Sequence, residues 1–116
     1  MAAASYDFVI EQGTTLNKSF VWKSSDGVVI PLTGYTARMQ VRTSQASPDV
    51  LLSLTTADAT IVITPNAGKV TLALTPAATS AITWRRGKYD LEIVSPTGVV
   101  TRLLSGTIEV SREITR

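Results

Sequence analysis

Residues 87–111 read GKYDLEIVSPTGVVTRLLSGTIEVS, and this segment predicts two antiparallel strands joined by a tight turn. Ser95–Gly98 suits a type I turn, because proline stands at its second position and glycine can take a positive φ at its last. A loop of this kind usually ends in a glycine bulge. The turn therefore predicts the register in which the two strands pair.

This register assigns each side chain of the hairpin to one face of a sheet. Glu92 is expected opposite Arg102, and Leu91 opposite Leu103. A cross-strand Glu92–Arg102 pair would add roughly a few tenths of a kcal/mol and disfavour slipped registers. The two faces then carry Tyr89, Leu91, Ile93 and Leu103 on one side, and Asp90, Glu92 and Arg102 on the other.

The second strand of the hairpin must change its parity along its length. Leu103 and Ile108 have opposite parity, so they share a face only if one extra residue is inserted between them. Gly106 is the natural place for that bulge. We therefore predict a long last strand, kinked near Ser105–Gly106, with Ile108 and Val110 facing the core.

The rest of the chain alternates short apolar runs with turn residues. Thr75 can cap a helix that starts with Pro76 and continues through residues 77–81, too short to form a layer of its own. We interpret it as a crossover between sheets. Turn signals every ~8–12 residues without a long helical period favour an antiparallel sandwich or barrel. The further strands are predicted at residues 6–12, 16–23, 28–32, 35–43, 50–54, 61–63 and 69–74.

Composition limits the classes of function. The chain has 116 residues, 44% of them hydrophobic and 17% charged, which fits one domain over residues 6–116 after a flexible arm at 1–5. It contains no cysteine and no histidine, so disulfides and the commonest general base and metal ligand are missing. A net charge of +2 argues against nucleic-acid binding. No apolar run approaches membrane-spanning length, and the first residues do not form a secretion signal.

Basic residues provide the candidate site, which is a protein interface. Arg85, Arg86 and Lys88 form the only basic cluster, which could grip a phosphate, a lipopolysaccharide or an acidic subunit, or be a solvated turn. Arg38 and Arg42 alternate with apolar residues on one predicted strand, so both point outward. They could join the cluster in a subunit contact or belong to an ordinary solvated sheet face.

Other polar and aromatic residues have simpler explanations. Trp22 and Trp84 could stack on a sugar, but core packing is the expected role of large aromatics. Asp90 and Glu92 point the same way, and pairing with arginine accounts for them better than glycosidase chemistry. We predict no catalytic, cofactor-binding or metal site and no small-molecule substrate. Turn chemistry, rather than a calcium loop, explains the three remaining candidates, Asp26, Asp49 and Asp58.

Three segments in order resemble a known group of proteins. They are Asp7–Thr15, Asp26–Arg42 and the closing hairpin that runs on to Arg116. This order resembles small tail-associated structural proteins of tailed bacteriophages, and more loosely the N-terminal domain of the phage baseplate upper protein. The resemblance implies an immunoglobulin-like sandwich. Together with the predicted strands and helix, this gives an all-β, immunoglobulin-like antiparallel β-sandwich with one short crossover helix.

The resemblance also implies a function without catalysis. We expect a virion structural protein, an adaptor subunit that joins tail parts or fibres through contacts with other virion proteins. The alternatives are a capsid decoration protein or a glycan-binding surface module. We expect a homo-oligomer in the particle, such as a ring or trimer, located in the virion tail rather than the capsid and made in the host cytoplasm. Neither membrane nor nucleic acid is an expected partner.

Overall fold

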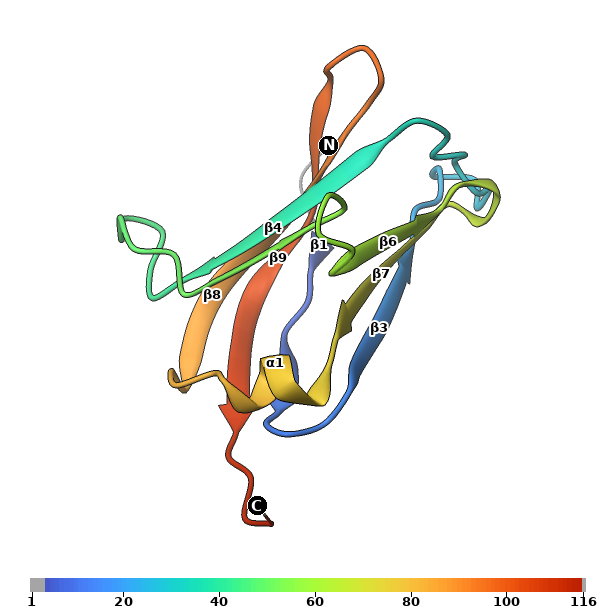
Figure 1. Cartoon of the computed structure of the whole chain (residues 1–116). Helices are drawn as coiled ribbons and strands as arrows, with labels where there is room; N and C mark the ends of the chain where they lie inside the picture. The colour runs from blue at the N-terminus through green and yellow to red at the C-terminus, as the bar shows by residue number, and fades with distance from the viewer. Residues whose placement is uncertain (1–3, 116) are drawn as a thin grey trace.

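The computed structural model describes residues 4–115, which form two β-sheets packed face to face with one short α-helix (Figure 1). In the larger sheet the order is β1-β9-β8-β4-β5, and β2 also pairs with β9; the smaller sheet has the order β3-β7-β6. The predicted all-β sandwich is therefore confirmed. In immunoglobulin terms β3, β7 and β6 correspond to strands B, E and D, and β9, β8, β4 and β5 to G, F, C and C′.

The elements of the described chain have the following bounds. The strands are β1 (Ala4–Ser5), β2 (Phe8–Glu11), β3 (Leu16–Val21), β4 (Thr36–Arg42), β5 (Leu52–Thr55), β6 (Ile61–Thr64), β7 (Lys69–Leu74), β8 (Arg86–Val94) and β9 (Val100–Ser111). A 3-10 turn at Pro65–Ala67 follows β6, and α1 (Pro76–Ser80) follows β7. Residues 4 and 5 of the predicted arm thus belong to β1, which runs parallel to β9. Residues 1–3 of that arm lie outside the described residues.

The core lies between the two sheets and follows the alternation of the sequence. In β4 the residues Ala37, Met39 and Val41 are buried while Arg38 and Gln40 are exposed, as predicted. Ile108 and Val110 of β9 are also buried, as predicted. The same two-residue period places the remaining core side chains of the larger sheet, which include Tyr89, Leu91 and Ile93.

The closing hairpin forms at the predicted turn. The amide of Gly98 donates to the carbonyl of Ser95 at 2.9 Å, and Gly98 has a φ of 90° that favours glycine. Glu92 lies opposite Arg102, as predicted. Leu91, however, lies opposite Leu104 rather than Leu103, because the register shifts between Leu91 and Glu92.

The extra residue of β9 is therefore Leu103, and the bulge predicted at Gly106 is wrong. Gly106 serves a different need, since a Cβ there would lie 2.1 Å from the carbonyl oxygen of Tyr6. The N-terminal segment runs alongside β9 here, between β1 and β2, and the amide of Tyr6 donates to the carbonyl of Ser105 at 2.9 Å. Glycine at position 106 thus leaves room for the neighbouring backbone. The strand changes which face its residues point to at Leu103 and Leu104 instead, and both of these pack against the core.

The strand predicted at residues 28–32 is also wrong. Only Val29 pairs in strand fashion, through an isolated bridge to Lys23. The segment distributes its backbone hydrogen bonds instead: the Ile30 amide donates to the Trp22 carbonyl, and the Leu32 amide donates to Pro65. Because the backbone hydrogen bonds of this segment go to two different parts of the chain within five residues, it does not form a continuous strand ladder with either.

The short helix α1 forms as predicted and joins the two sheets. Thr75 is its N-cap and accepts a hydrogen bond from the amide of Ala78 at 3.1 Å. The buried Thr79 hydroxyl donates to the carbonyl of Thr14 at 2.7 Å and accepts from the amide of Gly13 at 3.0 Å. These bonds hold α1 against the turn between β2 and β3, so the crossover from β7 to β8 is fixed.

Candidate protein interface on the outer sheet face

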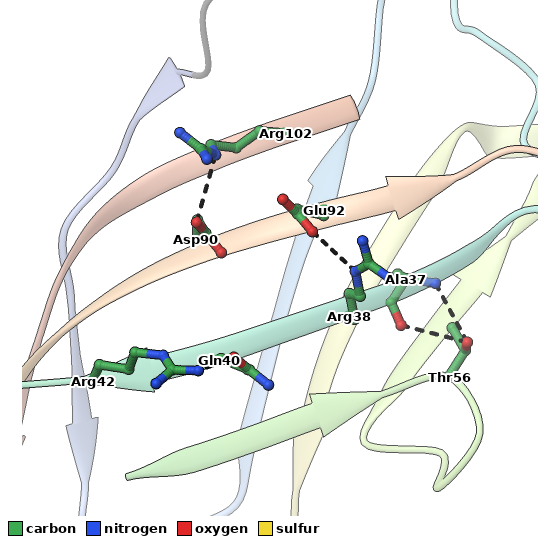
Figure 2. A network of polar contacts seen from close by, with 8 residues as sticks. All are labelled: Ala37, Arg38, Gln40, Arg42, Thr56, Asp90, Glu92 and Arg102. Carbon is green, nitrogen blue, oxygen red and sulfur yellow. Dashed lines mark hydrogen bonds and ion pairs between the residues drawn. The ribbon is translucent and has the colours of Figure 1, made fainter. Parts of the chain in front are cut away.

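The outer face of the larger sheet is built by the outward residues of β4 and β8 together with Arg102 of β9. Arg38 donates to Glu92 at 2.9 Å, and Arg102 pairs with Asp90 at 3.5 Å (Figure 2). Each pair joins neighbouring strands, so the charged side chains stand in an ordered row across the sheet. Pairing of both carboxylates with arginine was the predicted outcome.

The particular partners differ from the predicted Glu92–Arg102 pair. Arg38 lies directly opposite Glu92 in the β4–β8 register, and its guanidinium forms an ion pair with that carboxylate. Arg102 therefore pairs diagonally with Asp90, within the reach of a long side chain. The hairpin alone could not reveal this, because β4 is distant in sequence from β8.

Arg42 and Lys88 place two like charges side by side. They are directly opposite each other in the β4–β8 register. Among the ion pairs within residues 4–115, none takes either of them. The Arg42 guanidinium donates instead to two neutral acceptors, the Ser47 carbonyl and the Gln40 amide oxygen, each at 2.9 Å. Figure 2 shows Arg42 extended beside Gln40 on β4. Arg42 is thus held in place without being neutralised.

These two cations border a groove of about 610 Å³ on the outer face. Polar side chains from β4, β8 and β9, and from the segment after β4, line most of it. The N-terminal segment supplies one wall through Ser5 and Asp7. The other side chains that matter for its charge and hydrogen bonding are Gln40, Arg42, Gln45, Lys88, Asp90 and Arg102.

Tyr89 also lines this groove from below. Its hydroxyl donates to the carbonyl of Tyr6, which ties β8 to the N-terminal segment. Burial raises the pKa of the Tyr89 phenol above its usual value, and the nearby Asp7 carboxylate adds to that shift. Tyr89 therefore stays neutral and acts as a fixed support of the groove wall.

The arrangement suits an anionic protein surface. Like charges directly opposite each other on a sheet repel, and a carboxylate placed between them would relieve that repulsion. Arg42 already has a fixed orientation, so less side-chain freedom is lost when such a group binds. The groove thus holds the two cations Arg42 and Lys88 beside the carboxylates Asp7 and Asp90, and Arg42 is preorganised to bind a further acidic group.

The structure gathers most of the predicted interface residues on this one face. Arg38, Arg42, Arg86 and Lys88 all occupy outward positions of β4 and β8, and Arg86 lies 3.9 Å from Glu109. Arg86–Lys88 begin β8, so the alternative of a solvated turn does not hold for them. Arg85 precedes the strand, and its carbonyl accepts from the amide of Val110 at 2.8 Å.

Sequence reasoning missed most contributors to the groove, and Gln40, Asp90 and Asp7 show why. Gln40 and Asp90 have the same outward parity as the predicted arginines, so the alternation of β4 and β8 could have identified them. Asp7 has no such signal. Its place depends on the pairing of the N-terminal segment alongside β9, where its carboxylate accepts from the amide of Thr107 at 2.8 Å.

The remaining candidates occupy structural positions. Trp22 and Trp84 are half-buried and pack against the core, and Trp22 meets the Tyr35 ring edge-on at 6.3 Å. Asp26 accepts from the Ser24 hydroxyl and Asp58 accepts from Thr60, and these hydrogen bonds lower the pKa of each carboxyl. Turn chemistry therefore accounts for both.

Searches for other kinds of site and for relatives gave negative findings. Within residues 4–115, no group of three or more carboxylate, thiol or imidazole residues could hold a metal ion. No helix in the same range has the length and apolar character needed to cross a membrane. No model of a known protein family matches the chain, and a search of curated proteins found no similar sequence.

Proposed function

We propose that this protein is a structural subunit of a tailed-phage virion, an adaptor that joins tail or baseplate parts, or fibres, through protein–protein contacts. The order of the segments Asp7–Thr15, Asp26–Arg42 and the closing hairpin supports this proposal, because it resembles tail-associated phage proteins. The β-sandwich is the architecture that this resemblance implies.

The observation that carries the proposed adaptor role is the unneutralised pair Arg42 and Lys88 at the polar groove. A solvated sheet face needs no such arrangement, since replacing either cation by a neutral residue would remove the repulsion. In the proposed assembly, acidic side chains of a neighbouring virion protein occupy this groove. Arg38, Arg86 and Arg102 extend the contact as ordered charges around it.

The location of the protein in particles tests the proposed class. Virions purified from the phage or lysogen that encodes this chain would be labelled with gold-conjugated antibody and imaged by electron microscopy. We expect gold at the tail or baseplate. Gold distributed over the head would favour a capsid decoration protein instead, and particles without label would refute the virion assignment.

Incorporation of variants tests the proposed contact. A phage that lacks the gene would be complemented with Lys88→Glu, and bound protein would be quantified in purified particles. We expect at least about a tenfold loss of incorporation, since a new carboxylate would repel the acidic partner. Lys69→Glu is the matched control, because Lys69 lies on β7 of the other sheet. Equal incorporation of both variants would rule out the groove as the contact.

A further inference from the structure

A second, apolar groove of about 330 Å³ opens at the side of the sandwich. It lies between the last residues of β3 and the first residues of β9, and it borders the polar groove of the outer face, since Arg102 lines both. Ala4 forms part of its wall, and Val21, which is 48% exposed, lies at its rim. Its apolar lining comes from Phe20, Trp22, Leu103 and Leu104.

The groove is the open part of a side that is elsewhere closed by side chains. Along the earlier part of β3, the Lys18 ammonium lies 5.4 Å from the ring centre of Tyr6 and 5.5 Å from that of Phe8. The Tyr6 ring also meets the Phe20 ring edge-on at 5.3 Å. The groove follows Phe20, between residues 20–23 and the start of β9. Because β3 ends its sheet, its outer edge is also a place where a further extended segment can pair.

At the opposite end of the molecule, one apolar side chain is exposed to solvent. Ile114 is 93% exposed and lies beyond β9, in a segment without regular structure. Figure 1 shows that this segment leaves the sandwich at the end opposite to the β8–β9 hairpin. The groove borders residues 101–104 at the start of β9, so β9 separates the two features by roughly 25 Å at about 3.3 Å per residue.

We infer that the groove of one copy receives Ile114 of a second copy, so that the chains associate head to tail. The groove is apolar, it is large enough for an isoleucine side chain, and it lies beside an unpaired strand edge. Knob and groove are different surfaces at opposite ends, so each copy can bind one neighbour at each end. Such heterologous contacts form rings when the rotation closes and filaments when it does not. This association involves neither Arg42 nor Lys88 and would stand even if the outer face bound nothing.

Two complementary variants test the head-to-tail contact by light scattering over a range of protein concentrations. Ile114→Ser removes the knob, and Ala4→Phe fills the groove from its exposed wall without changing a core residue. We expect the wild-type protein to associate as its concentration rises, and each variant alone to need at least about tenfold more protein. An equimolar mixture should form a 1:1 dimer and nothing larger, because only one intact knob and one intact groove can meet.

Matched controls separate this contact from general changes in surface polarity. Val62→Ser removes an exposed apolar side chain on β6, outside the residues that line the groove, and Ala4→Ser leaves the groove open. Both should associate like the wild type. A wild-type protein that stays monomeric at every concentration would overturn the inference and leave the groove to a segment of another protein. Association that persists in both Ile114→Ser and Ala4→Phe would overturn it in favour of another face.

Discussion

Tyr89 is the side chain that joins β8 to the N-terminal segment. Its ring packs in the core, 5.4 Å from the Phe8 ring, while its hydroxyl donates to the carbonyl of Tyr6. The residue therefore combines apolar burial with a hydrogen bond that satisfies a backbone acceptor in the N-terminal segment beside β9. Both the hydrogen bond and the burial require a neutral phenol.

Tyr89→Phe should lower the free energy of unfolding by about 1–2 kcal/mol at pH 8, because the Tyr6 carbonyl loses its donor. The folded-state pKa of Tyr89 lies above the unfolded value of about 10. Its contribution is therefore complete below pH 10 and falls by up to about 1.4 kcal/mol per pH unit above it. Urea titrations between pH 8 and pH 11.5 should show the wild type converging on the variant. A difference that stays constant over this range would contradict the assignment.

At the scale of elements, local turn and cap chemistry predicts what forms, and tertiary contacts decide the details. The sequence of the Ser95–Gly98 turn was sufficient to predict the hairpin and the Glu92–Arg102 register. The bulge was predicted at the wrong residue because a glycine is needed at position 106 for a reason outside the hairpin: the Tyr6 carbonyl lies too close for a side chain. Residues 28–32 failed as a strand for a similar reason, since Trp22 and Pro65 take their backbone donors.

Variants of the N-cap residue Thr75 measure how much the stability of the crossover helix α1 depends on its cap. Thr75→Ala should destabilise the protein by about 1 kcal/mol, because the amide of Ala78 loses its acceptor. Thr75→Ser should retain nearly the full stability, since its hydroxyl can accept the same bond. Thermal denaturation of both variants checks this. Equal melting temperatures would show instead that the Thr79 hydrogen bonds alone hold the helix.

At the scale of the whole molecule, the like charges of Arg42 and Lys88 are expected to lower the stability of the folded protein. Lys88→Glu would turn the repulsion with Arg42 into an attraction, so we expect the free energy of unfolding to rise by about 0.2–1 kcal/mol. Guanidinium chloride would screen the effect, so urea denaturation at low salt is the appropriate measurement. A variant that is less stable than the wild type would show that Lys88 has a favourable partner in the folded protein.

Only those parts of the candidate site that follow from a local sequence pattern could be predicted from the sequence. Alternation along β4 and β8 is a local pattern, and it indicated that Arg38 and Arg42 point outward. The like-charge pair needs the β4–β8 register, and the groove wall needs the N-terminal segment, so both depend on contacts between distant parts of the chain. The apolar groove had no sequence signal, because its lining comes from residues 20–23 and 101–104, which only the fold brings together from two different sheets.

The parallel pairing of the first strands with the last has a mechanical consequence. Phe8–Glu11 and Ala4–Ser5 run alongside β9 in the same direction, so the two ends of the described chain leave from opposite ends of one ladder. Tension applied between the termini would slide these strands past each other and load all their hydrogen bonds together. A hairpin pulled at its open end would unzip one bond at a time instead. We therefore expect these paired strands to resist a pull between the two ends better than a hairpin pulled at its open end.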